Sequence, residues 1–326
     1  MKNFDTKRTV KTLIYVLLLV LPVSACSELW ENSVLPNPPR QAEFVSYFES
    51  GTTSIERPLN VALDAKGELY IVDGGSSRVL KFNRAGKLVS EWGEPGEGQG
   101  QFDFGPGKAE KSALAFGPDG VVYVADSFNN RIQKFDKRGN FEAEWGVEGL
   151  EAGQFRDPFG IAVGPDWSVY VSDGLNNNVQ KFDRDGNLLA AWGEIGIQPG
   201  KFSWPNSIAA SQEGRIYVAD RSNRRVQVFD RDGGFLFKFG FPGNDDGNFL
   251  QPTGIAVDQN GNIYVADVRR GDIQVFDPEG EFLTKWDGAA LESLEGMKPR
   301  ALVVDKNGRV YIADDESGRV LIYQLK

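Results

Sequence analysis

The sequence of 326 residues contains no histidine and only one cysteine, Cys26. Without imidazole side chains, the chain cannot build a zinc site with histidine ligands or a Ser-His-Asp or Cys-His nucleophile. A single cysteine also excludes a disulfide within the chain. Stability must therefore come from a buried hydrophobic core, which a chain of this length can supply within one large domain.

Positive charge is also scarce. The 36 Lys and Arg residues are outnumbered by 46 Asp and Glu residues, which gives a net charge of −10. Nucleic-acid binding depends on neutralising phosphates with basic side chains, so no nucleic-acid partner is expected. Adhesion of the protein surface itself to anionic lipid is disfavoured for the same reason.

A Tyr followed three residues later by an Asp recurs six times, and we name these six Asp residues the marker aspartates. The last five are spaced 47 residues apart, and the first gap is 53. The pairs are Tyr70/Asp73, Tyr123/Asp126, Tyr170/Asp173, Tyr217/Asp220, Tyr264/Asp267 and Tyr311/Asp314. A fixed period of this size is the signature of a repeat architecture.

Each repeat except the last contains four short apolar runs separated by Gly, Asp and Asn turns, as residues 158–192 illustrate. The runs are rich in Val, Ile, Tyr and Phe and show no 3.6-residue period, so four strands and no helix are predicted. Aromatic residues recur nine and nineteen positions after the marker aspartates, which predicts packing between neighbouring sheets. Gly occupies the first hairpin turn in five repeats, and Trp167 replaces it in the third.

Several segments resemble NHL repeats, namely Pro252–Asp258 (PTGIAVD), Asn262–Asp267 (NIYVAD) and Asn129–Asp136 (NNRIQKFD). Six copies in phase cover the chain from about Arg57 to its last residue. The resemblance implies an all-β, six-bladed β-propeller of four-stranded antiparallel blades over residues 42–326. WD-type and kelch repeats fit less well, because no Trp-Asp or Gly-Gly signature recurs.

The last repeat lacks the residues for its outermost strand. Upstream, Glu43–Phe48 resembles Lys87–Trp92, with Phe48 in the position of the Trp. We therefore expect this segment to supply the missing strand and to leave no open sheet edge. A free extended linker is the alternative.

Residues 1–25 have the features of a secretory signal, with basic residues, a short apolar run and small residues before a cleavage site. The run is too short for a permanent membrane-spanning helix. The tetrad Val23-Ser24-Ala25-Cys26 resembles a bacterial lipobox, which implies lipid attachment at Cys26 and a membrane partner. Pro-containing residues 26–41 would then form a tether.

This resemblance implies a lipid-anchored, extracytoplasmic protein of the cell envelope, at the periplasmic face of the outer membrane if the bacterium has two membranes. An ordinary signal peptide that ends near a Cys is the alternative.

One enzymatic branch of the resembled family, the peptidyl-hydroxyglycine amidating lyases, relies on histidine zinc ligands, which this chain lacks. Short turns that begin with Asp, such as Asp258–Gly261, suit turn capping better than calcium binding. We therefore expect no cofactor, with calcium as the alternative.

Function is expected where the repeats become irregular, on the propeller face that carries the links between blades. Residues beside the repeated Pro position should surround the channel mouth: Asp157, Phe159, Trp204, Asn206, Gln251, Thr253 and Arg300. Loops on the same face add a basic cluster of Arg221, Arg224, Arg269 and Arg270, which suits an anionic sugar, peptide carboxylate or phosphate. A cluster that is merely solvated is the alternative.

The sequence thus favours a binding or scaffolding module for a peptide, protein or glycan. The alternatives are a lactonase-like hydrolase or lyase that uses carboxylates or calcium, and a structural component of an envelope complex.

Overall fold

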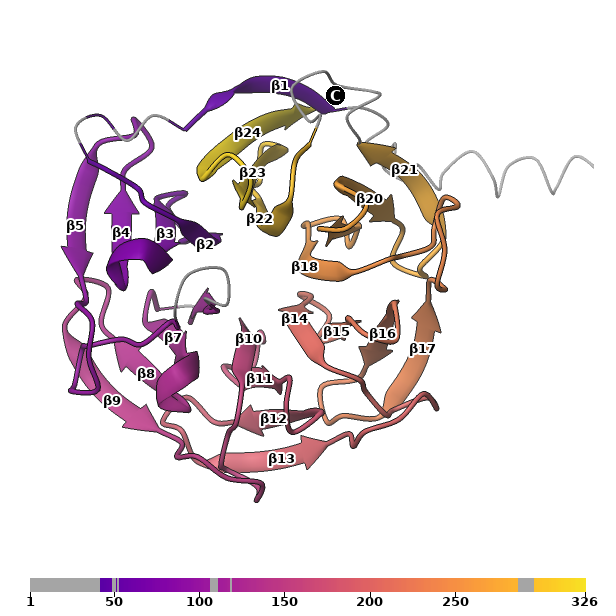
Figure 1. Ribbon diagram of the computed structural model, residues 1–326, viewed down its shortest axis with the longest axis horizontal. Coiled ribbons are helices and arrows are strands. Elements are labelled where there is room, and N and C mark those ends of the chain that lie inside the picture. The colour runs from indigo at the N-terminus through magenta and orange to yellow at the C-terminus, as the bar shows by residue number, and fades with distance from the viewer. Residues whose placement is uncertain (1–41, 49–50, 52, 106–110, 118, 287–295) are drawn as a thin grey trace, which may run out of the picture. The chain divides into compact units, whose positions relative to one another are not determined.

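The computed structural model describes residues 42–48, 51, 53–105, 111–117, 119–286 and 296–326. These residues form six four-stranded antiparallel sheets, arranged as blades around a ring (Figure 1). The six-bladed all-β propeller predicted from the repeats is confirmed. The predicted signal (1–25), Cys26 and the tether (26–41) lie outside the described residues.

Each of the first three blades runs from an inner strand to an outer strand in chain order. Blade 1 contains β2 (Pro58–Leu63), β3 (Leu69–Asp73), β4 (Arg78–Phe82) and β5 (Leu88–Trp92). Blade 2 contains β6 (Leu114–Phe116), β7 (Val122–Asp126), β8 (Arg131–Phe135) and β9 (Phe141–Trp145). Blade 3 contains β10 (Pro158–Val163), β11 (Val169–Asp173), β12 (Asn178–Phe182) and β13 (Leu188–Trp192).

The next two blades repeat this order, and the last differs in its outer strand. Blade 4 contains β14 (Pro205–Ala210), β15 (Ile216–Asp220), β16 (Arg225–Phe229) and β17 (Phe235–Phe239). Blade 5 contains β18 (Pro252–Val257), β19 (Ile263–Asp267), β20 (Asp272–Phe276) and β21 (Phe282–Trp286). Blade 6 contains β22 (Pro299–Val304), β23 (Arg309–Asp314), β24 (Arg319–Leu325) and β1 (Ala42–Tyr47).

Helix is limited to two short 3₁₀ turns in the described part of the chain, η1 (Gly74–Ser76) and η3 (Ser127–Asn129). Neither these turns nor any other described segment forms a helix with the length and apolar character needed to cross a bilayer.

The inner strands β2, β6, β10, β14, β18 and β22 surround the axis of the ring (Figure 1). Each contacts the inner strand of the next blade, and β22 contacts β2, so the ring is closed. A residue at the start of any inner strand therefore lies close to the residues at the same position in the neighbouring blades.

The repeated aromatic residues pack between blades, as their spacing predicts. The Trp145 ring on β9 lies 5.9 Å from the Phe182 ring of the next blade, and Trp192 lies 6.0 Å from Phe229 in the same way. The Trp145 indole also covers Gly186, where an added Cβ would approach it to 2.6 Å at a φ of +88°. Glycine is therefore required at this turn both for its backbone conformation and for the space it leaves.

The first hairpin turn needs positive φ in every repeat, including the one that lacks Gly. Gly120 has a φ of +85°, and Trp167 adopts +67° at the equivalent position. The Arg184 guanidinium lies 4.9 Å from the centre of the Trp167 ring. This cation–π contact offsets part of the cost of a left-handed conformation at a bulky residue.

Blade 6 receives its outer strand from the segment that precedes blade 1. Strand β1 pairs antiparallel with β24, and the Phe48 N–H donates to the Val320 carbonyl at 2.7 Å. The Phe48 ring lies 4.9 Å from the Phe82 ring of blade 1. At the equivalent positions between blades 1 and 2, the Trp92 ring lies 6.0 Å from the Phe135 ring. Phe48 thus takes the position of the repeated Trp, and two distant segments complete one sheet.

Replacing Phe48 with Ala should lower the free energy of unfolding by about 1–3 kcal/mol. This is less than the loss for a fully buried Phe, because Phe48 is only half-buried. Val45→Ala on the same strand is the control, since Val45 is 50% exposed and should change stability by no more than about 0.5 kcal/mol. Chemical denaturation measures both. Equal, small effects of the two substitutions would show that β1 does not stabilise the ring.

Candidate functional site

The marker aspartates hold the links between blades. Asp173 is fully buried, and its carboxylate accepts the backbone N–H groups of Arg156 at 2.8 Å and Asp157 at 3.1 Å. The other five accept link N–H groups in the same way: Asp73, Asp126, Asp220, Asp267 and Asp314. Burial raises the pKa of Asp173, while these hydrogen bonds oppose the rise. The repeated aspartates therefore serve the fold, as their recurrence predicts.

The recurrent arginines pair with the marker aspartates. The Arg131 Nε lies 2.8 Å from Asp126, and the Arg225 Nε lies 2.7 Å from Asp220. Both pairs are buried, so each charge is held by its partner and by nearby carbonyl groups rather than by solvent. These arginines are therefore part of the structure of the face.

Blade 5 departs from this pattern. Asp272 stands where the Arg occurs in most other blades, and Arg270 supplies the guanidinium instead, with its Nε 2.7 Å from the Asp272 carboxylate. Burial raises the pKa of Asp272 to about 6 despite this pair. The Arg270 side chain also contacts the carbonyl groups of Gly243 and Asp245 in the link between blades 4 and 5.

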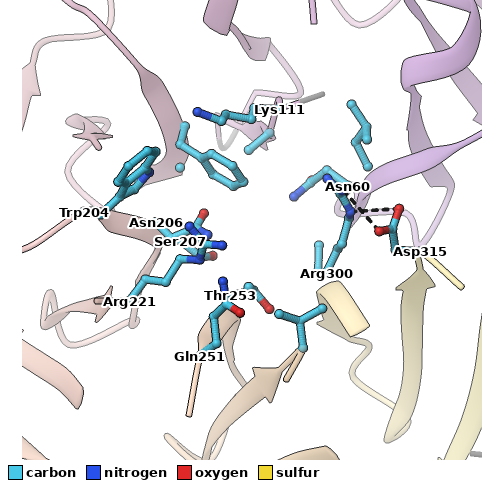
Figure 2. Close-up of a pocket in the computed structure, with 16 residues that line it drawn as sticks. Asn60, Lys111, Trp204, Asn206, Ser207, Arg221, Gln251, Thr253, Arg300 and Asp315 are labelled. Carbon is cyan, nitrogen blue, oxygen red and sulfur yellow. Dashed lines mark hydrogen bonds and ion pairs between the residues drawn. The ribbon is translucent and has the colours of Figure 1, made fainter. Parts of the chain in front are cut away.

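A cavity with a volume of about 280 Å³ lies at the mouth of the channel. All six blades contribute to its wall, because it lies where the inner strands begin. Figure 2 shows Lys111, Trp204, Arg221 and Arg300 around its open centre. The lining residues are Leu59, Asn60, Lys111, Ala113, Phe159, Gly160, Trp204, Asn206, Ser207, Arg221, Gln251, Thr253, Val268, Arg300, Ala301 and Asp315.

Seven of the residues predicted for the site line this cavity: Phe159, Trp204, Asn206, Arg221, Gln251, Thr253 and Arg300. Asp157 lies directly behind the wall, where it contacts Lys111. Arg224, Arg269 and Arg270 do not line it. In these two loops the residue that directly follows the marker aspartate lines the cavity, as Arg221 does, and the later residues do not. Of the four arginines of the predicted basic cluster, Arg221 is therefore the one that lines the cavity.

Four polar residues of the cavity were not among the predicted site residues: Asn60, Lys111, Ser207 and Asp315. Each occupies an irregular position of the repeat. Lys111 stands where the other repeats have Pro, and Asp315 directly follows a marker aspartate. Asn60 and Ser207 stand two residues after the Pro position, where the repeats also have Gly or Ala. Comparison of the repeats at these positions would have found them.

Asp315 is shared between two arginines. Its carboxylate lies 3.1 Å from Arg300 Nε and 3.0 Å from an Arg57 terminal nitrogen. Burial alone would raise the pKa of Asp315, but Arg300 and Arg57 outweigh it and hold the pKa below its usual value. Asp315 is therefore a carboxylate that fixes cations, not a base with a raised pKa.

Lys111 and Trp204 form the opposite side of the cavity. Lys111 Nζ lies 2.8 Å from the Asp157 carboxylate and 5.2 Å from the centre of the Trp204 ring. Trp204 has a φ of +55°, and its backbone N–H donates to the Asn177 side-chain oxygen at 2.9 Å. The indole covers Gly174, where an added Cβ would come within 2.8 Å of it. A strained backbone and a matched glycine thus fix Trp204 beside the cavity.

Arg221 differs from the other cations of the site. It forms no ion pair with any carboxylate in the described part of the chain, and its guanidinium lies 5.9 Å from the centre of the Trp204 ring. With the amide of Gln251 in the orientation that satisfies both groups, Arg221 Nε donates to the Gln251 oxygen at 2.8 Å. Burial and the nearby Arg300 lower the pKa of Arg221, and Asp157 opposes them. The site therefore holds a half-buried cation whose charge is not matched directly.

The cavity wall also contains a buried polar atom that lacks a partner. Asn206 is 4% exposed, and its side-chain oxygen has no hydrogen-bond partner among the described residues. An unsatisfied buried acceptor costs about 1–3 kcal/mol, so this atom lowers the stability of the wall locally.

Within the described residues, no group of three or more Cys, Asp and Glu side chains is placed to hold a metal ion. The Asp residues of the turns on the opposite face cap their own turns. Asp258, for example, accepts the N–H groups of Asn260 at 2.8 Å and Asn262 at 2.9 Å.

Two family models match the chain. Residues 112–135 match the NHL repeat, and residues 201–291 match a family described as a 6-bladed beta-propeller. The chain is an NHL-repeat β-propeller. The matched segments lie in blade 2 and in blades 4 and 5, and the same period of repeats continues through the other blades.

A probable peptidyl-alpha-hydroxyglycine alpha-amidating lyase of Caenorhabditis elegans is 33% identical to this propeller over 101 residues, which are 29% of this chain and 27% of that protein. The peptidylglycine alpha-amidating monooxygenase of Rattus norvegicus is 27% identical over 139 residues, 39% of this chain and 13% of that protein. The matches thus span about a quarter or less of these relatives.

Among solved structures, a gluconolactonase from Xanthomonas campestris has a TM-score of 0.61 at 16% identity and covers 90% of this chain and 93% of its own. A catalytically inactive His-to-Ala variant of virginiamycin B lyase from Staphylococcus aureus has a TM-score of 0.60 at 15% identity, with 88% and 99% covered. At these identities the similarity shows the fold alone.

Proposed function

We propose that this propeller is a binding module that captures an anionic group at the mouth of its central channel. The observation that carries the proposal is Arg221, a half-buried guanidinium without an ion-pair partner in the described part of the chain, beside the Trp204 ring. A carboxylate or phosphate would form charge-assisted hydrogen bonds with it. The anionic group would belong to a peptide, a protein segment or a glycan.

The remaining charges at the mouth are arranged for holding a ligand. Asp315 fixes Arg300, and Asp157 fixes Lys111, so these cations keep one position without a ligand. A binding site that is already ordered loses less conformational entropy when its ligand arrives. The cavity is therefore suited to binding without rearrangement.

A hydrolase or lyase similar to those of the same fold is the second candidate. General base catalysis is most efficient when the pKa of the base lies near the working pH. The pKa of Asp315 is held below its usual value, and Asp157 is paired with Lys111. Virginiamycin B lyase has a histidine whose replacement by Ala gives a catalytically inactive variant. This chain has no counterpart of that residue, because it contains no histidine. Binding is therefore favoured over catalysis.

The binding proposal is tested with the full-length protein in detergent and a panel of small probes. The panel pairs peptides that have a free or an amidated C-terminus, and acidic sugars with neutral ones. Anionic members should raise the melting temperature, because a ligand of the native state stabilises it. Arg221→Gln should weaken this binding about 10-fold or more, since a charged hydrogen bond contributes about 1.5–3 kcal/mol.

Arg224→Gln is the matched control, because Arg224 belongs to the same loop but does not line the cavity. Stoichiometric bound calcium, together with lactone hydrolysis that survives Arg221→Gln, would instead support the enzyme.

We further propose that the propeller is anchored to a membrane of the cell envelope by lipid on Cys26, with the domain outside the cytoplasm. The support is the sequence around Cys26 alone. Several acyl chains would hold the protein firmly, since each buried CH₂ contributes about 0.8 kcal/mol.

Cys26→Ala should move the protein from the membrane fraction to the soluble fraction, or leave it as the uncleaved precursor. Fractionation and intact mass report the two results. A variant that still fractionates with membranes at the mature mass would contradict the anchor.

A further inference from the structure

We infer that the ligand of the cavity is an acidic monosaccharide or a terminal sugar residue that carries one carboxylate or phosphate. The inference rests on the proposed binding function and names the chemistry that the wall of the cavity selects. Three properties of the wall carry it: its size, its balance of charge and its uncharged polar groups.

The size of the cavity limits the ligand to a single small ring. Its volume of about 280 Å³ lies just below the range for ligand pockets, which is about 300–1,000 Å³. Because the inner strands of all six blades surround it, the cavity cannot widen without separating the blades. A folded domain or a long peptide would contact only its rim.

The charges select a single acidic group. Lys111 is balanced by Asp157, and Arg300 is held by Asp315. Arg221 has no carboxylate as an ion-pair partner among the described residues, and it adds positive charge next to Arg300. A carboxylate or phosphate placed between these two arginines would reduce the excess positive charge of the site, and Figure 2 shows the two arginines on opposite sides of the cavity. A neutral ligand would leave Arg221 unmatched.

The uncharged polar groups select hydroxyls. The Ser207 hydroxyl oxygen accepts the Ile255 N–H at 3.2 Å, which leaves its proton available to a ligand. The Asn60 side-chain oxygen accepts the Leu114 N–H at 3.4 Å, which leaves its NH₂ group to donate. A sugar ring supplies hydroxyl oxygens that accept hydrogen bonds from these two donors.

The aromatic residues complete the site. Trp204 and Phe159 are the aromatic residues of the lining. The C–H face of a sugar ring is apolar and packs against such surfaces, while the hydroxyls at its edge remain free for hydrogen bonds. A peptide terminus would also match the acid-binding arginines, and it is therefore the competing ligand.

Calorimetry with the full-length protein in detergent tests the inference. The probes are glucuronate, glucose 6-phosphate, glucose and acetate, and the first two carry the same ring with different acids. We expect glucuronate or glucose 6-phosphate to bind at least about 10-fold more tightly than either glucose or acetate. Arg221→Gln should remove most of this advantage over glucose.

Ser207→Ala separates recognition of the ring from recognition of the acid. It should weaken binding of the acidic sugar several-fold and leave the weak binding of acetate unchanged, whereas Arg221→Gln weakens both. Arg224→Gln should change neither. Circular dichroism of each variant verifies the fold.

If glucose binds as tightly as glucuronate, the site does not select an acidic group. If acetate binds as tightly as glucuronate, the site does not select a sugar ring. If neither acidic sugar binds but peptides with a free C-terminus stabilise the protein through Arg221, the inference fails and the proposed function stands. If those peptides also have no effect, both fail.

Discussion

The contact on which the rest of the structure depends joins each buried marker aspartate to the link that enters its blade. A buried carboxylate costs several kcal/mol unless hydrogen bonds satisfy it, so the surrounding N–H groups are fixed in place. In blade 3 these are the N–H groups of Arg156 and Asp157, directly before the inner strand. The link, the start of the inner strand and the loop after the marker aspartate are thereby held together at one edge of the channel.

This constraint explains why the site lies where it does. The residue after each marker aspartate and the residues beside the Pro position are brought to the same edge in every blade. The fold requires no particular side chain at these positions, so they vary between repeats. Arg221, Trp204 and Asp315 occupy such positions and meet in one cavity. The regular part of the repeat fixes the backbone, and the irregular part supplies the chemistry.

The fold could be predicted almost entirely from the sequence, because each blade is specified by local strands and turns that recur six times. Even the pairing of β1 with β24 was visible from the aromatic position of Phe48. The site could be predicted only in part. Phe159 and Trp204 could be assigned to the cavity wall because they lie beside the repeated Pro position. The sequence does not show how far each loop extends over the channel, so it could not show that Arg269 and Arg270 do not line the cavity. Lys111 replaces the repeated Pro, but this replacement alone does not show that Lys111 belongs to the cavity wall.

Charge pairing between distant positions could not be read from one sequence. The repeat shows Arg in most blades where blade 5 has Asp272, and nothing local indicates that Arg270 compensates for it. In the same way, the balance of Arg57, Arg300 and Asp315 joins two blades that are far apart in the chain. The net positive mouth of an acidic propeller is therefore a property of the closed ring. It would concentrate anions at the channel, and salt would weaken the effect.

If ligands contact the irregular mouth and not the repeated core, the tryptophans should respond differently to a ligand. The indole N–H signals of the tryptophans can be followed by NMR during titration with glucuronate. We expect the Trp204 signal to shift, while the signals of Trp92, Trp145, Trp192 and Trp286, which are packed between blades, stay in place. A titration that shifts the signals of the interblade tryptophans and leaves that of Trp204 unchanged would show that ligands do not bind at the mouth.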